Sequence, residues 1–289
     1  MRWKGREKSK NVEDRRGQTA KKIGGGIGVG TIIMVVLALL MGQDPGSILR
    51  QVIQQQQQQP KAQTTNNNAP RSAEEDELAA FVSVVLNDTE EVWHRLFKEQ
   101  IGKPYKEPIL VLFTGSVSSA CGHASAATGP FYCPADYKLY IDLSFYQQLK
   151  KQFSVSGDFA MAYVVAHEVA HHVQNLLGIS GQVSSQRGKI PQKEYNELSK
   201  RLELQADFLS GVWANHADEM NDILESGDIQ EALDAAHAIG DDNIQKKTQG
   251  YVVPDSFTHG SSEQRVRWFK KGYQTGDLNQ GDTFNANPL

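Results

Sequence analysis

The residues best suited to chemistry lie in AHEVAHH, residues 166–172. His167 and His171 are four positions apart, so on a helix both imidazoles project from one face, one turn from each other. Glu168 follows the first histidine and can reach a water held between the two rings. This HExxH spacing is typical of zinc sites in which two neutral imidazoles bind the metal and the carboxylate acts as a general base.

The competing interpretation is a helix that merely exposes its histidines. The residues around the motif argue against it, because they predict a largely buried helix whose polar side chains need partners. His172 lies about 140° around the helix from His167 and is expected to be structural or at the surface. The flanking apolar residues are Tyr163, Val164, Val165, Val169 and Val173.

A third metal ligand is best sought in RLELQADFLSG, residues 201–211. Glu203 and Asp207 are four apart and share one face of an expected helix. If Glu203 binds the metal, Asp207 lies one turn on and can accept an N–H from a ligand histidine, His167 first. The alternative is that both carboxylates are solvated surface charges. Weaker candidates for the third ligand are His216, His237 and Glu197.

Charge is unevenly distributed along the 289 residues. Residues 1–22 carry nine Lys or Arg against three Asp or Glu, which leaves 21 basic and 31 acidic residues for the remainder. An acidic body argues against nucleic acid as a partner.

Residues 23–43 hold no charge and are long enough to cross a bilayer as a helix. The positive-inside rule then predicts a retained signal anchor with residues 1–22 in the cytoplasm, the alternatives being a cleaved signal peptide or a buried helix.

Residues 44–72 are expected to form a flexible linker, because their glutamine run and the following QTTNNNAP cannot bury enough apolar surface to fold.

A folded domain is expected over residues 73–289. Ser72 and Glu75 predict a capping box at its first helix, and Asn87 or Asp88 predicts the start of a second. The pattern favours an α+β class, mainly helical with a small sheet. Further helices are expected over 158–177, 194–215, 228–239 and 261–271, and strands over 109–113 and 139–143.

The two cysteines, Cys121 and Cys133, enclose 11 residues. In an oxidising compartment this spacing suits a disulfide. The alternative is a pair of buried free thiols.

HExxH followed by ExxAD on a later helix resembles the gluzincin class of zinc peptidases. The agreement is broader with one bacterial family, the membrane-anchored neutral zinc metallopeptidases. It covers nearly the whole chain except the glutamine-rich linker, which departs from the family in composition. The motifs that carry it are MRWKGREKSKNVEDRRG, CGHASAATGPFYCPADYKLYIDLSF, AHEVAHHVQ, RLELQADFLSG, AHAIGDDNIQ and THGSSEQRVRWFKKGY.

The resemblance implies a zincin-like metallopeptidase domain that uses Zn²⁺. His167, His171 and Glu203 would be the metal ligands. Glu168 would be the general base that takes a proton from water and passes it to the leaving amine. By analogy with gluzincins, Asp207 would lie behind the ligands and hold one of them.

The resemblance also suggests residues around the catalytic centre. His259, in THGSSEQR, is the candidate for stabilising the oxyanion, the alternative being a loop or helix-capping role. Tyr251 is a further donor candidate, and Arg265 matches an arginine that follows the histidine in related membrane gluzincins. In many zinc peptidases the strand before the motif helix forms an edge where substrate adds as an extra strand, which would place Phe131 and Tyr132 beside the cleft.

The sequence therefore predicts a zinc-dependent peptidase, most simply an endopeptidase, acting on protein or peptide substrates. It would be anchored in the bacterial inner membrane through residues 23–43, with the catalytic domain outside the cytoplasm. One alternative is a catalytically silent zinc-binding protein of the envelope. Another is a zinc hydrolase that acts on an amide bond in non-protein envelope material. Glu168 favours catalysis, since a structural zinc needs no base.

Overall fold

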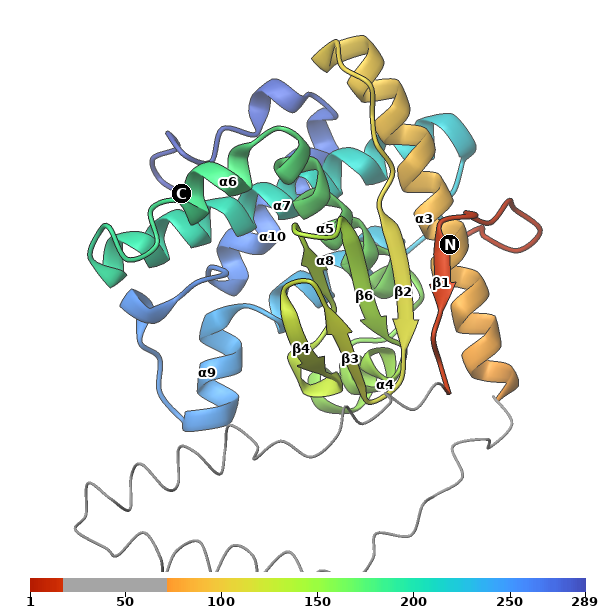
Figure 1. The fold of residues 1–289 in the computed structure, drawn as a ribbon, viewed down its shortest axis with the longest axis horizontal. Helices are drawn as coiled ribbons and strands as arrows, with labels where there is room; N and C mark the ends of the chain where they lie inside the picture. Colours follow the sequence, from red (N-terminus) through yellow and green to blue (C-terminus); the bar gives the residue numbers. More distant parts are fainter. Residues whose placement is uncertain (18–71) are drawn as a thin grey trace, which may run out of the picture. The chain divides into compact units, whose positions relative to one another are not determined.

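A four-stranded sheet in the order β1-β2-β6-β5 supports the fold (Figure 1). The computed structural model describes residues 1–17 and 72–289. β2 (Ile109–Phe113) pairs in parallel with both β1 (Val12–Asp14) and β6 (Lys138–Asp142). β5 (Phe131–Cys133) pairs antiparallel with β6 and forms one edge of the sheet.

The two faces of the sheet are covered by different elements. Leu110 and Leu112 of β2 belong to the large core that the helices share, whereas Val111 and Phe113 belong to a smaller apolar cluster on the other face. This period-two alternation is what a strand buried on both sides requires. The smaller cluster includes Val117 of a hairpin formed by β3 (Ser116–Ser119) and β4 (Gly122–Ser125).

Helices cover the face of the sheet to which Leu110 and Leu112 contribute, and they form most of the domain (Figure 1). α5 packs against α3, α7 and α8, while α7 runs along α10. Glycines allow that last contact, because a Cβ at Gly211 would lie 2.1 Å from the Phe269 carbonyl oxygen and one at Gly272 would lie 2.0 Å from that of Phe208. The helices are α3 (Ala73–Leu96), α4 (Ser144–Phe153), α5 (Phe159–Leu176), α6 (Ile179–Ser184), α7 (Gln192–Asn221), α8 (Asp228–Ala238), α9 (Asp241–Gln249) and α10 (Ser262–Thr275).

The expected α+β class is confirmed, as are the helices that carry the site and the capping box at Ser72. α5 ends one residue before Leu177, and Gly178 follows with a left-handed φ of 79°. A separate helix starting at Asn87 or Asp88 is wrong, because α3 continues to Leu96. Asp88 binds Arg6 instead of capping a helix. The sequence analysis did not anticipate β1, β3, β4, β5, α4, α6 or α9.

The N-terminal residues differ most from expectation. Met1–Arg16 forms one compact unit with Arg71–Leu289, whereas the sequence suggested a separate tail over residues 1–22. The physical reason is that this segment supplies β1 and several ion pairs to the domain. The expected membrane segment, residues 23–43, and all but the last residue of the expected linker, 44–72, lie outside the described residues. Within the described ranges, no helix combines the length and apolar character that crossing a bilayer demands.

Candidate metal centre

Three potential ligands converge between α5 and α7. His167 and His171 project from the same face of α5, and Glu203 faces them from α7. Glu203 Oε2 lies 3.2 Å from His167 Nε2 and 3.4 Å from His171 Nε2. One donor atom from each residue lies within 4.8 Å of the other two. The structure thus brings together two imidazoles and a carboxylate, a donor set that suits zinc.

The remaining ring nitrogens are held by neighbouring groups. His167 Nδ1 donates to Asp207 Oδ1 at 2.9 Å, and His171 Nδ1 donates to Gln174 Oε1 at 2.9 Å. These bonds direct both Nε2 atoms toward Glu203, which is the orientation that metal ligation needs. Gln174 is fully buried and also donates to the Leu202 carbonyl of α7. The sequence analysis missed Gln174, although its position three residues after His171 on the same helix was a usable signal.

Asp207 is the centre of a buried network. It accepts from Tyr163 Oη at 2.5 Å and from Arg265 Nε at 2.9 Å as well as from His167. Arg265 is only 3% exposed and comes from α10, whose close packing on α7 brings the guanidinium to the carboxylate. Arg265 therefore acts through Asp207 on a ligand histidine, and its charge compensates the buried carboxylate.

The charges of the centre shift its pKa values strongly. Burial alone would lower the pKa of His171, but the charge and hydrogen bond of Glu203, with the charge of Glu168, together outweigh burial and raise that pKa to about 9. At His167 burial likewise lowers the pKa, but the charge and hydrogen bond of Asp207 help to raise it, and the pKa lies above its usual value. Burial raises the pKa of Glu203, yet the charges of His171 and His259 hold it well below its usual range. When no metal competes, the ionised Glu203 carboxylate therefore lies beside a His171 ring that is protonated at neutral pH.

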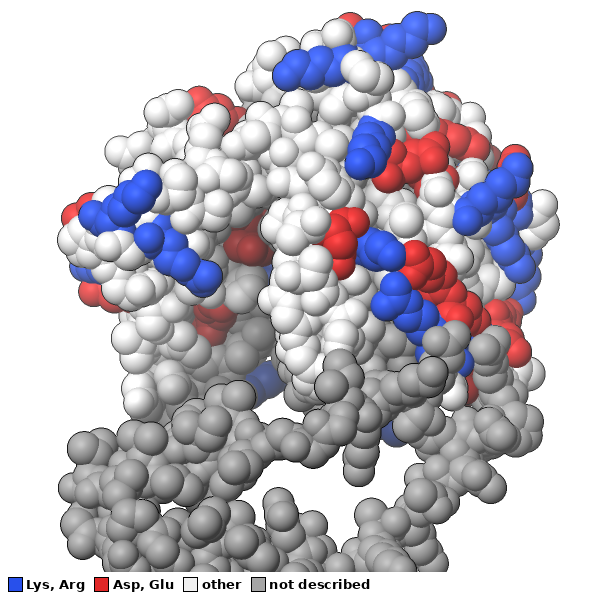
Figure 2. Space-filling view, viewed as in Figure 1, with Lys and Arg blue, Asp and Glu red and all other residues white. Residues whose placement is uncertain are grey.

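Glu168 lies in a cleft of about 420 Å³ beside the ligands. The ligand trio and Glu168 contribute polar atoms to its lining, whereas most of the other lining residues are apolar. Figure 2 shows this face hollowed between the sheet strands and the neighbouring helices, with acidic atoms visible inside. Phe131 and Tyr132 of the edge strand do border the cleft. The other apolar wall residues are Pro130, Phe145, Phe153, Val164, Ile239 and Ile244.

His259 also borders the cleft and is oriented by Asp241. Its Nδ1 lies 3.2 Å from Asp241 Oδ1, and the other oxygen of that carboxylate accepts the backbone N–H groups of Thr258, His259 and Gly260. The charge of Glu203 raises the pKa of His259, and burial opposes this. Tyr251 is 63% exposed and is absent from the residues that line the cleft. Asp241 was missed by the sequence analysis, which had no local spacing to link it to His259.

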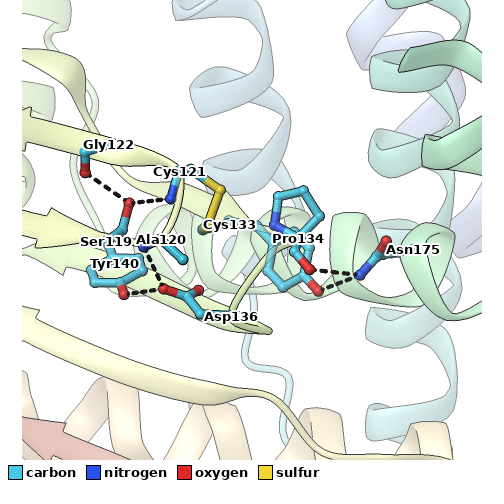
Figure 3. The surroundings of a disulfide bond; sticks show 10 residues. Ser119, Ala120, Cys121, Gly122, Cys133, Pro134, Asp136, Tyr140 and Asn175 are labelled. Carbon is cyan, nitrogen blue, oxygen red and sulfur yellow. Dashed lines mark hydrogen bonds between the residues drawn. A yellow bond between two sulfur atoms is a disulfide. The ribbon is translucent and has the colours of Figure 1, made fainter. Parts of the chain in front are cut away.

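Two features fix the edge strand beside the cleft. A disulfide joins Cys121, at the tip of the β3–β4 hairpin, to Cys133 in β5 (Figure 3). His172 is fully buried, accepts from Tyr132 Oη and donates to the Lys106 carbonyl. Burial lowers the pKa of His172 to about 4, so the ring is neutral at pH 7. His172 is structural, and it ties α5 to the strand that borders the cleft.

The weaker ligand candidates lie elsewhere. His216 contacts the Gly276 carbonyl, Glu197 pairs with Lys200, and His237 is exposed on α8. A second group of carboxylates, Asp158, Asp228 and Glu231, could also surround a cation. There the α-amino group of Met1 already contacts Asp158 and Asp228.

The family model described as "putative neutral zinc metallopeptidase" matches residues 1–284. The chain belongs to this family. It is 46% identical over 294 residues to "Uncharacterized protein YpfJ" of Escherichia coli (strain K12), covering 98% of this chain and 99% of the relative. "Uncharacterized protein Rv2575" of Mycobacterium tuberculosis is 41% identical over 263 residues, or 87% and 86% of the two chains. No solved structure matches the chain. Family membership implies Zn²⁺, and the donor set described above fits it.

Zinc binding is expected to release protons and to weaken as the pH falls. A histidine must be deprotonated to bind zinc, and the pKa of His171 is about 9. At pH 7 loading should therefore displace at least one proton per chain. Calorimetry in two buffers of different ionisation enthalpy measures this number. Equal heats in both buffers for the unmodified chain would contradict the expectation.

Replacing Asp207 by asparagine is expected to weaken zinc affinity by roughly 10- to 100-fold, the usual cost of losing a partner that orients a ligand. The carboxylate fixes His167, and an amide presents only one acceptor oxygen to its four donor groups. Competition against a chromophoric chelator gives the affinity. Tyr163→Phe is the matched control, since it removes a hydrogen bond from the same carboxylate but none from His167. Equal affinities in the two variants would show that Asp207 does not orient the ligand.

Proposed function

We propose that the chain is a zinc-dependent peptidase that cleaves peptide bonds in the cleft between β5 and α5. The observation that carries the proposal is the position of Glu168. This carboxylate borders the cleft one residue after a ligand histidine, while the ligand set is already completed by Glu203. A site that only held zinc for structure would have no use for such a base.

Bound zinc would supply Lewis-acid polarisation and an activated water. Glu168 takes the proton from the attacking water and returns it to the leaving amine. His259 lines the cleft and Asp241 holds its Nδ1, so a protonated ring would donate through Nε2 to the developing oxyanion. Asp207 and Gln174 keep the two ligand rings in place during these steps.

The cleft also favours a particular kind of substrate. β5 is an edge strand, so an extended polypeptide can pair with its free side and be positioned along the cleft. The apolar walls then favour a bulky apolar side chain next to the scissile bond. These features support an endopeptidase acting on unfolded or extended protein.

The test is cleavage of an unfolded protein by the full-length chain. We expect chelator-sensitive cleavage that returns with added zinc, and mass spectrometry of the products should show internal sites flanked by large apolar residues. Glu168→Gln prepared in parallel controls for contaminating proteases. Stoichiometric zinc without cleavage of any protein would contradict the proposal and favour a zinc-binding interaction protein or a hydrolase of non-protein amides.

A further inference from the structure

The first 16 residues pack into the folded domain and add a strand to its sheet. β1 pairs with β2 through Val12 opposite Leu110, Glu13 opposite Val111 and Asp14 opposite Leu112. Backbone bonds extend the ladder, because Leu110 N donates to Asn11 O and Arg15 N donates to Leu112 O, both at 2.8 Å. β1 is thus the edge strand opposite β5, and its partner strand lies about a hundred residues later in the chain.

Side chains of the segment bind carboxylates that the domain buries. Arg6 binds both oxygens of Asp88, at 3.0 and 2.6 Å, and Asp88 is fully buried in α3. Ser9 and Asn11 donate to Glu90, two residues further along α3, at 2.7 and 2.9 Å. Without the segment these buried acids would lose their partners, which is costly in a low-dielectric interior.

The segment also reaches the start of the helix that carries the metal ligands. The α-amino group of Met1 lies 2.9 Å from Asp158, 2.8 Å from Glu225 and 3.2 Å from Asp228. Asp158 caps α5. Burial lowers the pKa of this amine, but hydrogen bonds to Glu225 and Asp158 dominate and raise it to about 10. The ammonium is therefore charged at neutral pH and lies within ion-pair distance of all three carboxylates.

These contacts give the basic residues of the segment a structural role. Arg2 pairs with Asp222, Lys4 with Glu77, and Arg6 with Asp88. Figure 2 shows basic and acidic side chains interleaved over the side of the molecule where β1 and β2 lie in Figure 1. The positive-inside rule counts such residues as topology signals, yet here they bind the folded domain.

We propose that residues 1–16 and the metallopeptidase domain lie on the same side of the membrane. A single crossing between residues 17 and 71 would place β1 and β2 in different compartments, and the sheet and the Arg6–Asp88 pair could not form. The two parts of the chain that form this sheet therefore share one compartment. This inference replaces the single-pass arrangement expected from charge. It rests on the fold and is independent of the proposed peptidase activity.

The disulfide indicates which side this is. A Cys121–Cys133 bridge persists in an oxidising compartment. Both the segment and the domain are then expected outside the cytoplasm.

Thiol labelling in intact cells tests the proposal. Lys8→Cys and Lys270→Cys each introduce one thiol at an exposed position, the first in the segment and the second in α10. The native cysteines are joined in the disulfide, so the unsubstituted full-length chain is the blank. A membrane-impermeant maleimide is applied before and after permeabilisation, in a Glu168→Gln background so that activity plays no part. Lys10→Cys is a second site in the segment if Lys8→Cys reduces the amount of folded protein.

We expect both positions to react in intact cells to the same extent. Protection of both until permeabilisation would also support the shared compartment, while placing it inside. Labelling of one position and protection of the other would overturn the proposal. Because no readout involves hydrolysis, a failure here leaves the proposed peptidase function untouched, and the reverse holds as well.

Discussion

Glu168→Gln should lose turnover while it keeps its zinc. A glutamine has nearly the same shape but cannot take a proton, and positioned acid–base catalysis contributes about 10²- to 10⁴-fold to rate. Glu168 is 8% exposed and lies outside the ligand trio, so its replacement leaves the donor set intact. The measurement is kcat on an unfolded protein substrate, together with zinc content by elemental analysis of the same sample.

His171→Ala is the matched variant on the same helix. It removes a ligand, so zinc and activity should be lost together, whereas Glu168→Gln separates the two. Both variants should unfold cooperatively in a melting experiment, which shows that the helix survives. If Glu168→Gln cleaved as fast as the unmodified chain, the base would have to be sought elsewhere and the assigned chemistry would be wrong.

The sequence could predict those site residues that are spaced by about one helical turn within a single helix. His167, Glu168 and His171 share one helix, and the helical period alone places them together. Glu203 and Asp207 carry the same period on a second helix. Their placement against the first required only that the two helices pack, which small Ala206 and the apolar positions around it favour.

What the sequence could not predict depends on contacts between distant segments. Asp241 holds His259, 18 residues later, through a loop whose conformation no periodicity describes. Arg265 reaches Asp207 because Gly211 and Gly272 let α10 approach α7 closely. Neither glycine has a positive φ or stands in a turn, so the sequence gives no sign of the close contact that it allows.

The N-terminal segment shows the same limit more severely. β1 has three residues, too few for an alternating pattern to be recognised, and its partner lies about a hundred residues away. Its arginines were interpreted from composition as membrane-topology signals. Asp88 was interpreted as a helix cap for a related reason, since aspartate is a common capping residue and its actual partner, Arg6, lies 82 residues earlier.

At pH 8 Arg6→Ala should strongly destabilise the fold, although Arg6 lies far from the metal ligands in sequence and precedes β1, the edge strand opposite β5. The substitution leaves Asp88 buried without its counter-charge, which costs about 3 kcal/mol in comparable buried pairs. For a domain of this size that corresponds to a fall in Tm of about 10 °C. Lys4→Ala is the matched control, because the Lys4–Glu77 pair is largely exposed and such pairs contribute little.

The pH dependence gives this prediction a second, independent readout. Burial raises the pKa of Asp88 to about 7, and Arg6 opposes that rise. An acid whose folded pKa is raised favours the folded state most when protonated, so its contribution falls as the pH climbs from about 4 through 7. At pH 5 Asp88 is largely neutral with or without Arg6, and the variant should lose little. At pH 8 Asp88 is mostly ionised and is paired with Arg6 in the unmodified chain, whereas the variant has no counter-charge for it. The difference in Tm between the unmodified chain and the variant should therefore widen. A gap that is constant from pH 5 to 8, or one equal to that of Lys4→Ala, would show that the segment is not docked through this pair.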